Sequence, residues 1–81
     1  MQISIAEIKN RLIDYFKEKV DTIVDSDTLL LEDKVIDSMG VIELVAFLEA
    51  TYGVEFTDDD LTIDNFKTIG SISNLIASKP G

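Results

Sequence analysis

The sequence predicts an all-α fold, a small four-helix bundle with a long loop between helices 1 and 2 and a short third helix. Apolar residues recur at intervals of three and four positions in residues 5–20, 38–52 and 69–76, as on the inner face of a helix. Residues 21–37 lack this period and contain turn-forming residues. The 81 residues, 46% of them hydrophobic, suit one domain, so we expect residues 1–81 to form a single domain with no linker.

The first helix is expected to begin at Ser4. Ser4-Ile5-Ala6-Glu7 has the pattern of a capping box, in which the serine and glutamate side chains bond to backbone amides of the first turn. A helix lying on a membrane would show a similar apolar stripe but a more uniformly basic polar face, so we expect this one to pack in the core. The stripe consists of Ile5, Ile8, Leu12, Tyr15, Phe16 and Val20.

Residues 21–37 are expected to form a long loop. The apolar run Leu29-Leu30-Leu31 is too short to be a helix of its own. A loop of this length in a small domain is usually functional or packed by its own side chains. We therefore expect residues 29–31 and Ile36 to reach into the core.

The second helix is expected to run from Ser38 to Tyr52 and to end at Gly53, which suits a left-handed helix end. It carries two apolar stripes, a wide one for the core and a narrow one beside Ser38. The narrow stripe suits either a protein-docking surface or a deeply buried helix, and we favour docking because acids border it. The wide stripe is Val41, Leu44, Val45, Leu48 and Tyr52; the narrow one is Met39, Ile42 and Ala46, bordered by Glu43 and Glu49.

The C-terminal part predicts a short helix and a longer one. Residues 57–60 (Thr-Asp-Asp-Asp) suit the first turn of a short third helix, and Thr68 is expected to cap the last helix. Pro80-Gly81 is expected to mark the end of order. Oxygen-bearing residues at alternate positions resemble a calcium loop, but the required glycine and glutamate are replaced by Ile63 and Ile69. The oxygen-bearing residues are Asp58, Asp60, Thr62 and Asp64.

Composition excludes several classes of function and of partner. The chain has no Cys and no His, which excludes thiol nucleophiles, imidazole bases and the usual zinc sites. The net charge is −9, and residues 21–66 carry thirteen acids against Lys34 alone. This argues against nucleic acid and against anionic membranes, and it favours basic proteins as partners. No long apolar segment or signal peptide is apparent, so we expect a cytoplasmic monomer without membrane insertion.

Ser38 is the candidate site. Either Asp37 or Ser38 suits the N-cap of the second helix, and the free amides and dipole of that helix end favour a phosphate. A surface hydroxyl there is therefore a plausible point of attachment for a phosphodiester. A plain N-cap is by itself the commoner role of such a pair, as Asp25-Ser26 illustrates in the same chain.

The frame around Ser38 resembles the acyl carrier proteins over essentially the whole chain. Asp37-Ser38-Met39 is similar to the family's Asp-Ser-Leu signature, and residues 42–45, 48–49 and 52–56 fit the same register. The resemblance implies that 4′-phosphopantetheine is esterified to Ser38, with Asp37 and Met39 beside it. The group would come from coenzyme A through a phosphopantetheinyl transferase and would supply the missing thiol.

The resemblance also implies a carrier rather than an enzyme. An acyl or aminoacyl group would ride as a thioester in fatty acid, polyketide or related biosynthesis. Loading ligases or synthases with basic surfaces would dock on the narrow stripe of Met39, Ile42, Glu43, Ala46 and Glu49. The chain itself offers no nucleophile and base pair, so we expect no catalytic residues.

Three departures bear on the pathway. Gly40, Ala46 and Ala50 replace residues that make this helix more acidic or more apolar in fatty-acid carriers. Asp-Ser-Met-Gly also resembles the D-alanyl carrier proteins, which work with a stand-alone ligase. We favour a specialised carrier; an aminoacyl carrier and an unmodified acidic module that only binds proteins stay open as alternatives.

Overall fold

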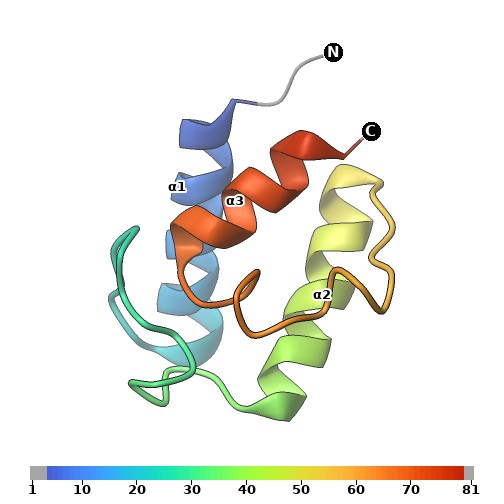
Figure 1. The fold of residues 1–81 in the computed structure, drawn as a ribbon. Coiled ribbons are helices and arrows are strands. Elements are labelled where there is room, and N and C mark those ends of the chain that lie inside the picture. Colours follow the sequence, from blue (N-terminus) through green and yellow to red (C-terminus); the bar gives the residue numbers. More distant parts are fainter. Residues whose placement is uncertain (1–3, 80–81) are drawn as a thin grey trace.

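The computed structural model describes residues 4–79 and confirms an all-α fold, with no strand among these residues. The helices are α1 (Ile5–Tyr15), the π-helix η1 (Phe16–Val20), α2 (Ser38–Tyr52) and α3 (Ile69–Ser78). α3 packs across α1, and α2 stands beside this pair (Figure 1). Within the described part of the chain there are three α-helices, so the expected four-helix bundle is not found.

The start of α1 differs from the prediction. Ser4 is the N-cap residue and its carbonyl accepts the Ile8 N–H at 3.1 Å, but its side chain makes no capping bond. The capping box with Glu7 is therefore wrong. Residues 4–7 are all exposed, so water can satisfy the first-turn amides without help from side chains.

The end of the first helical segment widens into η1. The backbone N–H groups of Asp21 and Thr22 both bond to the carbonyl of Phe16, and Asp21 is left-handed with φ 55°. This closure stops the helix and turns the chain into the long loop. The helical segment thus covers the predicted residues 5–20, with an α-helical part followed by a π-helical part.

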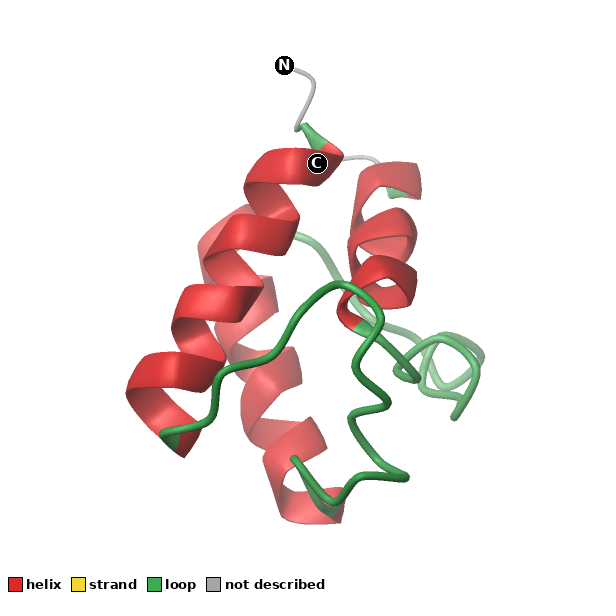
Figure 2. Ribbon diagram, turned by 90° about the vertical axis from the view of Figure 1, so that its left-hand side faces the viewer, coloured by secondary structure: helices red, strands yellow, loops and turns green. Residues whose placement is uncertain are grey.

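The long loop is fixed to the C-terminal part of the chain by backbone bonds. The Leu30 N–H bonds to the Lys67 carbonyl at 2.9 Å, and the Gly70 N–H bonds to the Ser26 carbonyl at 3.1 Å. A Cβ on Gly70 would lie 3.1 Å from the Ser26 hydroxyl oxygen, so this close approach favours glycine. Figure 2 shows the loop in green, passing across the front of the helices in that view.

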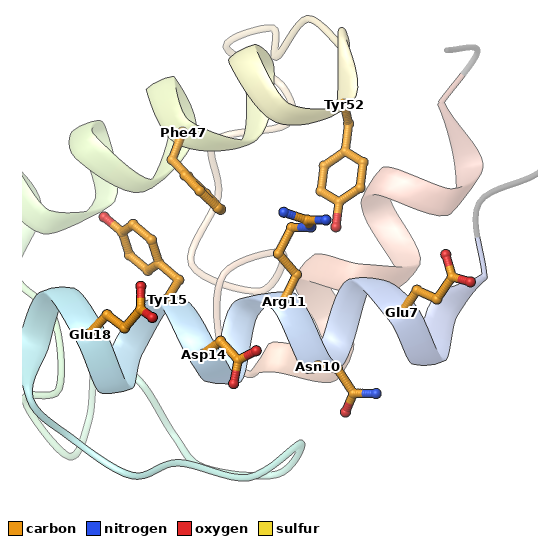
Figure 3. A pocket seen from close by; sticks show the side chains of 8 residues that line it. All are labelled: Glu7, Asn10, Arg11, Asp14, Tyr15, Glu18, Phe47 and Tyr52. Atoms are coloured by element: carbon orange, nitrogen blue, oxygen red, sulfur yellow. The ribbon is translucent and has the colours of Figure 1, made fainter.

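Aromatic side chains join α1 to α2. The rings of Tyr15 and Phe47 lie 4.6 Å apart between centroids, and Tyr15 also meets Phe16 edge to face at 5.5 Å. Figure 3 shows Tyr15 and Phe47 facing each other from the two helices. Such ring pairs stabilise the packing of α1 against α2 beyond the effect of the apolar area that the rings bury.

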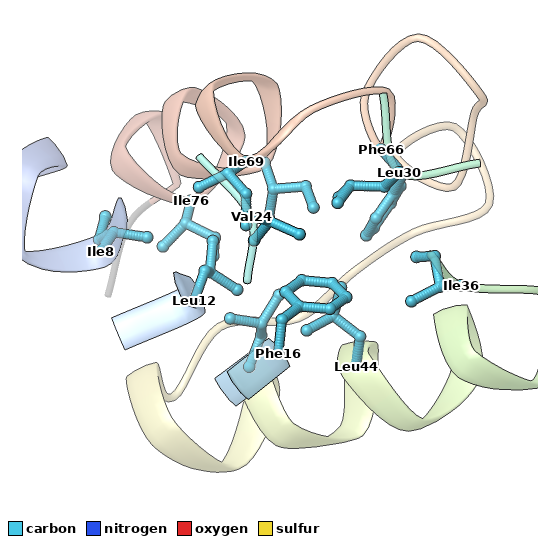
Figure 4. Packing of buried hydrophobic residues seen from close by; sticks show 12 residues of the cluster. Ile8, Leu12, Phe16, Val24, Leu30, Ile36, Leu44, Phe66, Ile69 and Ile76 are labelled. Carbon is cyan, nitrogen blue, oxygen red and sulfur yellow. The ribbon is translucent and has the colours of Figure 1, made fainter. Parts of the chain in front are cut away.

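One hydrophobic core joins all three helices, the loop and the segment before α3 (Figure 4). As predicted, Leu30 and Ile36 reach it from the loop, while Leu29 and Leu31 are half-buried. Two members of the wide α2 stripe, Leu44 and Leu48, are fully buried. The core comprises Ile8, Leu12, Phe16, Val24, Leu30, Ile36, Leu44, Leu48, Phe66, Ile69, Ile72 and Ile76.

The expected short third helix does not form. Residues 58–60 and 63–66 are turns, in which the Asp60 N–H bonds to Thr57 O at 3.0 Å and the Thr62 N–H to Asp60 O at 3.0 Å. Side chains compete for the same backbone groups: the Asp60 carboxylate accepts the Thr57 N–H, and the Asn65 amide donates to Asp60 O. Short polar residues of this kind favour turns over helix interiors, and so brief a helix is marginal in any case.

The start of α3 agrees with the prediction. Thr68 caps α3, because its hydroxyl oxygen accepts the Ser71 N–H at 3.0 Å. The expected end of order at Pro80-Gly81 lies outside the described residues, as do residues 1–3. None of the helices in residues 4–79 is both long enough and apolar enough to span a bilayer.

Candidate functional site

Ser38 is the first residue of α2. The preceding Asp37 is extended and is the N-cap, since its Oδ1 accepts the Gly40 N–H at 2.8 Å. Of the two capping candidates in the sequence, the structure therefore selects Asp37 and leaves the Ser38 hydroxyl out of the cap. Ser38 is exposed at a helix end where backbone amides and the helix dipole favour an anion.

Ile36 anchors the start of α2 to the core, since its side chain is 7% exposed and belongs to the hydrophobic cluster. A Cβ on Gly40 would lie 3.2 Å from the Ile36 Cβ and 3.4 Å from the Asp37 Oδ1. The first turn thus packs closely onto the loop, and glycine at position 40 permits this approach. Burial of Ile36 and the Asp37 cap together fix the backbone at Ser38.

Ser38 borders an open cavity of about 630 Å³ between the start of α2 and the turns before α3. Most of its lining is apolar. Two of the apolar lining side chains, Leu61 and Ile63, are 46% and 74% exposed to solvent. We call it the Ser38 groove; its lining residues are Leu31, Glu32, Ser38, Val41, Leu61, Thr62, Ile63 and Phe66.

The Ser38 groove was not predicted from the sequence, because residues 57–60 were expected to begin a short helix and not a turn. The available signal was the pair Leu61 and Ile63, two apolar residues within an acidic run. Their alternation is unlike a helical stripe and suits a wall that shows apolar side chains to one side.

The narrow stripe of α2 is exposed. Met39 and Ile42 are 65% and 62% exposed, and Ala46 and Glu43 are exposed with them, so this stripe is not part of the core. Glu49 differs, because it is half-buried and its Oε2 accepts the Phe56 N–H at 3.1 Å. Glu49 therefore holds the connector after α2 in addition to bordering the stripe.

A second open cavity, of about 540 Å³, lies between α1 and α2 (Figure 3). The Tyr52 hydroxyl is buried there without a hydrogen-bond partner, although the Arg11 guanidinium lies beside it (Figure 3). Burial raises the pKa of Tyr52, and the nearby Arg11 charge partly offsets this. Its lining residues are Glu7, Asn10, Arg11, Asp14, Tyr15, Glu18, Phe47 and Tyr52.

In neither cavity, among the residues that the structure describes, does a hydroxyl donate a hydrogen bond to a carboxylate. The chain contains no His or Cys, and within residues 4–79 no three acidic side chains gather closely enough to hold a metal ion. The Ser38 groove instead offers a hydroxyl at its edge and apolar walls. This arrangement suits a residue that is modified by another protein better than one that reacts by itself.

Comparison with known proteins finds a matching family over most of the chain. The family model described as "phosphopantetheine attachment site" matches residues 6–76. The chain is 34% identical to the anthracycline acyl carrier protein DauA of Streptomyces sp. (strain C5) over 61 residues, which cover 74% of this chain and 73% of that protein. It is 28% identical to the acyl carrier protein of Rickettsia canadensis (strain McKiel) over 76 residues, covering 90% and 86%.

Proposed function

Because the chain belongs to the phosphopantetheine-attachment family of carrier domains, we propose that Ser38 carries its 4′-phosphopantetheine group. Members of this family bind the group covalently, and acyl carrier proteins use it as carriers and not as catalysts. The observation that supports Ser38 is its exposed hydroxyl at the first residue of α2, outside a cap that Asp37 already provides. The whole domain, residues 1–81, is proposed to serve this one attachment.

The other serines in the matched range are less suitable. Ser73 is fully buried and donates to the Ile69 carbonyl at 2.8 Å. The Ser71 hydroxyl oxygen accepts from Thr68, and Ser78 lies beyond residue 76, where the family match ends. Ser26 is half-buried, with its oxygen close to Gly70.

The residues around Ser38 fit a phosphodiester. In the proposed transfer, the Ser38 Oγ forms a bond to the phosphorus that bears the pantetheine arm, and the pyrophosphate bond of coenzyme A breaks. Adenosine 3′,5′-diphosphate leaves, and the hydroxyl proton passes to a base of the separate transferase. The Asp37 cap and the first-turn amides keep the serine at a helix end that tolerates the new negative charge.

The attached group would supply the thiol that this chain lacks, and an acyl or aminoacyl cargo would be held on it as a thioester. The apolar walls of the Ser38 groove are available to the cargo, and the flexible arm keeps it at high effective concentration near a docked enzyme. We propose a specialised biosynthetic carrier, supported by Gly40 at the tightly packed start of α2 and by the likeness to a carrier named for anthracyclines.

Partner enzymes are proposed to meet the exposed stripe of α2. Met39, Ile42 and Ala46 offer apolar contact, and Glu43 offers a charge that would attract a basic surface. Glu49 contributes less freely, because its carboxylate already binds the Phe56 amide. The transferase and the loading ligase or synthase would share this surface in turn.

Mass spectrometry tests the attachment. The chain is incubated with coenzyme A and a broad-specificity transferase, and the wild type should gain the mass of one phosphopantetheinyl group. Ser38→Ala should gain nothing, whereas Ser26→Ala, which alters the other Asp-Ser pair, should gain the same mass as the wild type. A wild type that gains no mass, or Ser38→Ala that still gains it, would contradict the proposal.

A further inference from the structure

The Asp60 carboxylate is the centre of the turns that precede α3. Its Oδ2 accepts the backbone N–H of Thr57 at 2.9 Å and the Thr57 hydroxyl at 3.1 Å. The same oxygen pairs with the Lys79 Nζ at 2.5 Å. Asp60 thus joins the beginning of the turn segment to the end of α3, nineteen positions along the chain.

Lys79 is held on both sides. Its Nζ lies 5.3 Å from the centre of the Phe56 ring, so the ammonium group has an aromatic face as well as a carboxylate. The side chains of Lys79 and Asp60 are only 14% and 19% exposed. Limited contact with water makes this pair a firmer restraint than an ordinary surface ion pair.

The segment that Asp60 holds is also one wall of the Ser38 groove. The Asp60 carbonyl accepts the Asn65 amide at 2.9 Å, which closes residues 60–65 into a compact unit. Leu61, Ile63 and Phe66 from this segment line the groove opposite Ser38. The position of the wall therefore depends on what fixes Asp60.

Few other contacts fix the outer part of this wall. Leu61 and Ile63 are 46% and 74% exposed, so they bury too little area to anchor the segment, whereas Phe66 is 2% exposed and anchors only its end. The bonds from backbone to backbone within residues 57–62 are local turn bonds. Among the hydrogen bonds and ion pairs of residues 57–64 in the described part of the chain, the pair with Lys79 is the one that reaches outside residues 57–66.

We propose that the Asp60–Lys79 pair is a latch that positions the wall of the Ser38 groove and so sets how well a cargo chain on Ser38 is shielded from water. Asp60 and Lys79 act as positioning residues and touch no reacting atom. This inference rests on the proposed function for its effect on cargo, but the latch itself is a property of the unmodified chain. When the latch opens, Leu61 and Ile63 move away from α2 and an apolar chain loses cover.

The first experiment measures amide hydrogen exchange on the unmodified protein by NMR. Lys79→Gln should speed exchange several-fold at Leu61 and Thr62, whose N–H groups bond within the turns. Lys67→Gln is the matched control, because it removes the same charge from an exposed lysine close in sequence to the same segment. Lys79→Arg keeps the positive charge and should restore the wild-type rates.

The second experiment measures shielding on the loaded protein. Octanoyl and acetyl thioesters are formed on the attached group and cleaved with hydroxylamine; the octanoyl chain offers apolar area for the groove to cover, and the acetyl group offers little. Lys79→Gln should raise the octanoyl rate several-fold and leave the acetyl rate unchanged, while Lys67→Gln and Lys79→Arg should match the wild type. A general loss of stability would also uncover the octanoyl chain, and the exchange rates of core amides distinguish it from local opening of the wall.

Three results would overturn the latch. Unchanged exchange at Leu61 and Thr62 in Lys79→Gln would show that the pair does not hold the wall. Faster exchange that extends equally to core amides such as Ile8 and Ile72 would show general destabilisation. Faster local exchange with an unchanged ratio of octanoyl to acetyl rates would show that the wall does not shield cargo. Failure of the attachment itself appears separately, as a wild type that gains no mass.

Discussion

Replacement of Asp37 by alanine tests whether the residue before Ser38 acts as a helix cap. In the structure, its Oδ1 accepts the Gly40 N–H at 2.8 Å, a short bond to an amide that has no partner within the helix. Alanine removes the acceptor and leaves the amide to water. Asparagine keeps an acceptor of the same reach but removes the charge.

The expected change in the unfolding free energy of Asp37→Ala follows from two opposing effects. Loss of an N-cap side chain costs about 1 kcal/mol, which for a domain of this size lowers Tm by roughly 4–8 °C. Removing an acid also relieves repulsion, because residues 21–66 carry thirteen acids and one lysine. Asp33→Ala measures the second effect alone, since Asp33 is an exposed acid in the same loop that serves as no helix cap. The difference between Asp37→Ala and Asp33→Ala should therefore be about 1 kcal/mol.

Urea unfolding followed by circular dichroism, with thermal melts on the same samples, provides the assay. Asp37→Asn should stay within a few tenths of a kcal/mol of the wild type, since asparagine caps helices about as well as aspartate. An Asp37→Ala protein as stable as Asp33→Ala would refute the capping role. An Asp37→Asn protein as unstable as Asp37→Ala would show that charge, and not the hydrogen bond, stabilises the start of α2.

Three further predictions concern other parts of the fold. Gly53 ends α2 at φ 66° with open space where a Cβ would lie, so Gly53→Ala should cost about 1 kcal/mol in unfolding free energy through backbone strain alone, and Gly53→Asn less. Leu30 is fully buried, so Leu30→Ala should cost about 2–5 kcal/mol in urea unfolding, whereas Leu29→Ala at a half-buried position should cost clearly less. The hydrogen bond from Lys79, together with the Thr57 amide, holds the pKa of Asp60 below its ordinary value of 3.8. The ionised Asp60 therefore stabilises the fold above that value, and this contribution disappears as pH falls through the lowered pKa; Asp60→Asn should flatten stability against pH in the acid range, and an unchanged slope would contradict this.

The parts of the fold that the sequence predicts well are those with a repeated local pattern. α2 begins at Ser38 and ends before Gly53 as expected, and Thr68 caps α3. In each case the period of the apolar residues and a capping residue indicate the same boundary. The exposed position of Met39 beside Ser38 also follows from this pattern.

The wrong predictions occur where a short polar side chain has more than one possible hydrogen-bond partner nearby. Ser4 and Glu7 have the capping-box spacing, yet at an exposed helix start the side-chain bond gains little over water. Thr57 and Asp60 bond to each other within a turn in place of starting a helix, which is an alternative that the same residue types always allow. The contact between Asp60 and Lys79 is long-range, so no short motif could indicate it.

In the candidate site, too, local sequence patterns predicted one part and tertiary packing determines the other. The family resemblance singled out Ser38, and the helix start explains its exposure. The Ser38 groove depends on where the turns before α3 lie relative to α2, which is a property of tertiary packing. Local sequence patterns therefore located the proposed attachment point but not the surface beside it.

The backbone bonds of the long loop set an order for folding. Leu30 bonds to Lys67 and Ser26 to Gly70, so the loop has no firm position until residues some forty places further along the chain are available. Ile36, which anchors the start of α2 to the core, belongs to the same loop. On a ribosome, α1 and α2 can form early, but Ser38 acquires its native surroundings only after the segment around residue 70 has emerged. A transferase that recognises the folded start of α2 would therefore act only after the segment around residue 70 has emerged, and not on a shorter nascent chain.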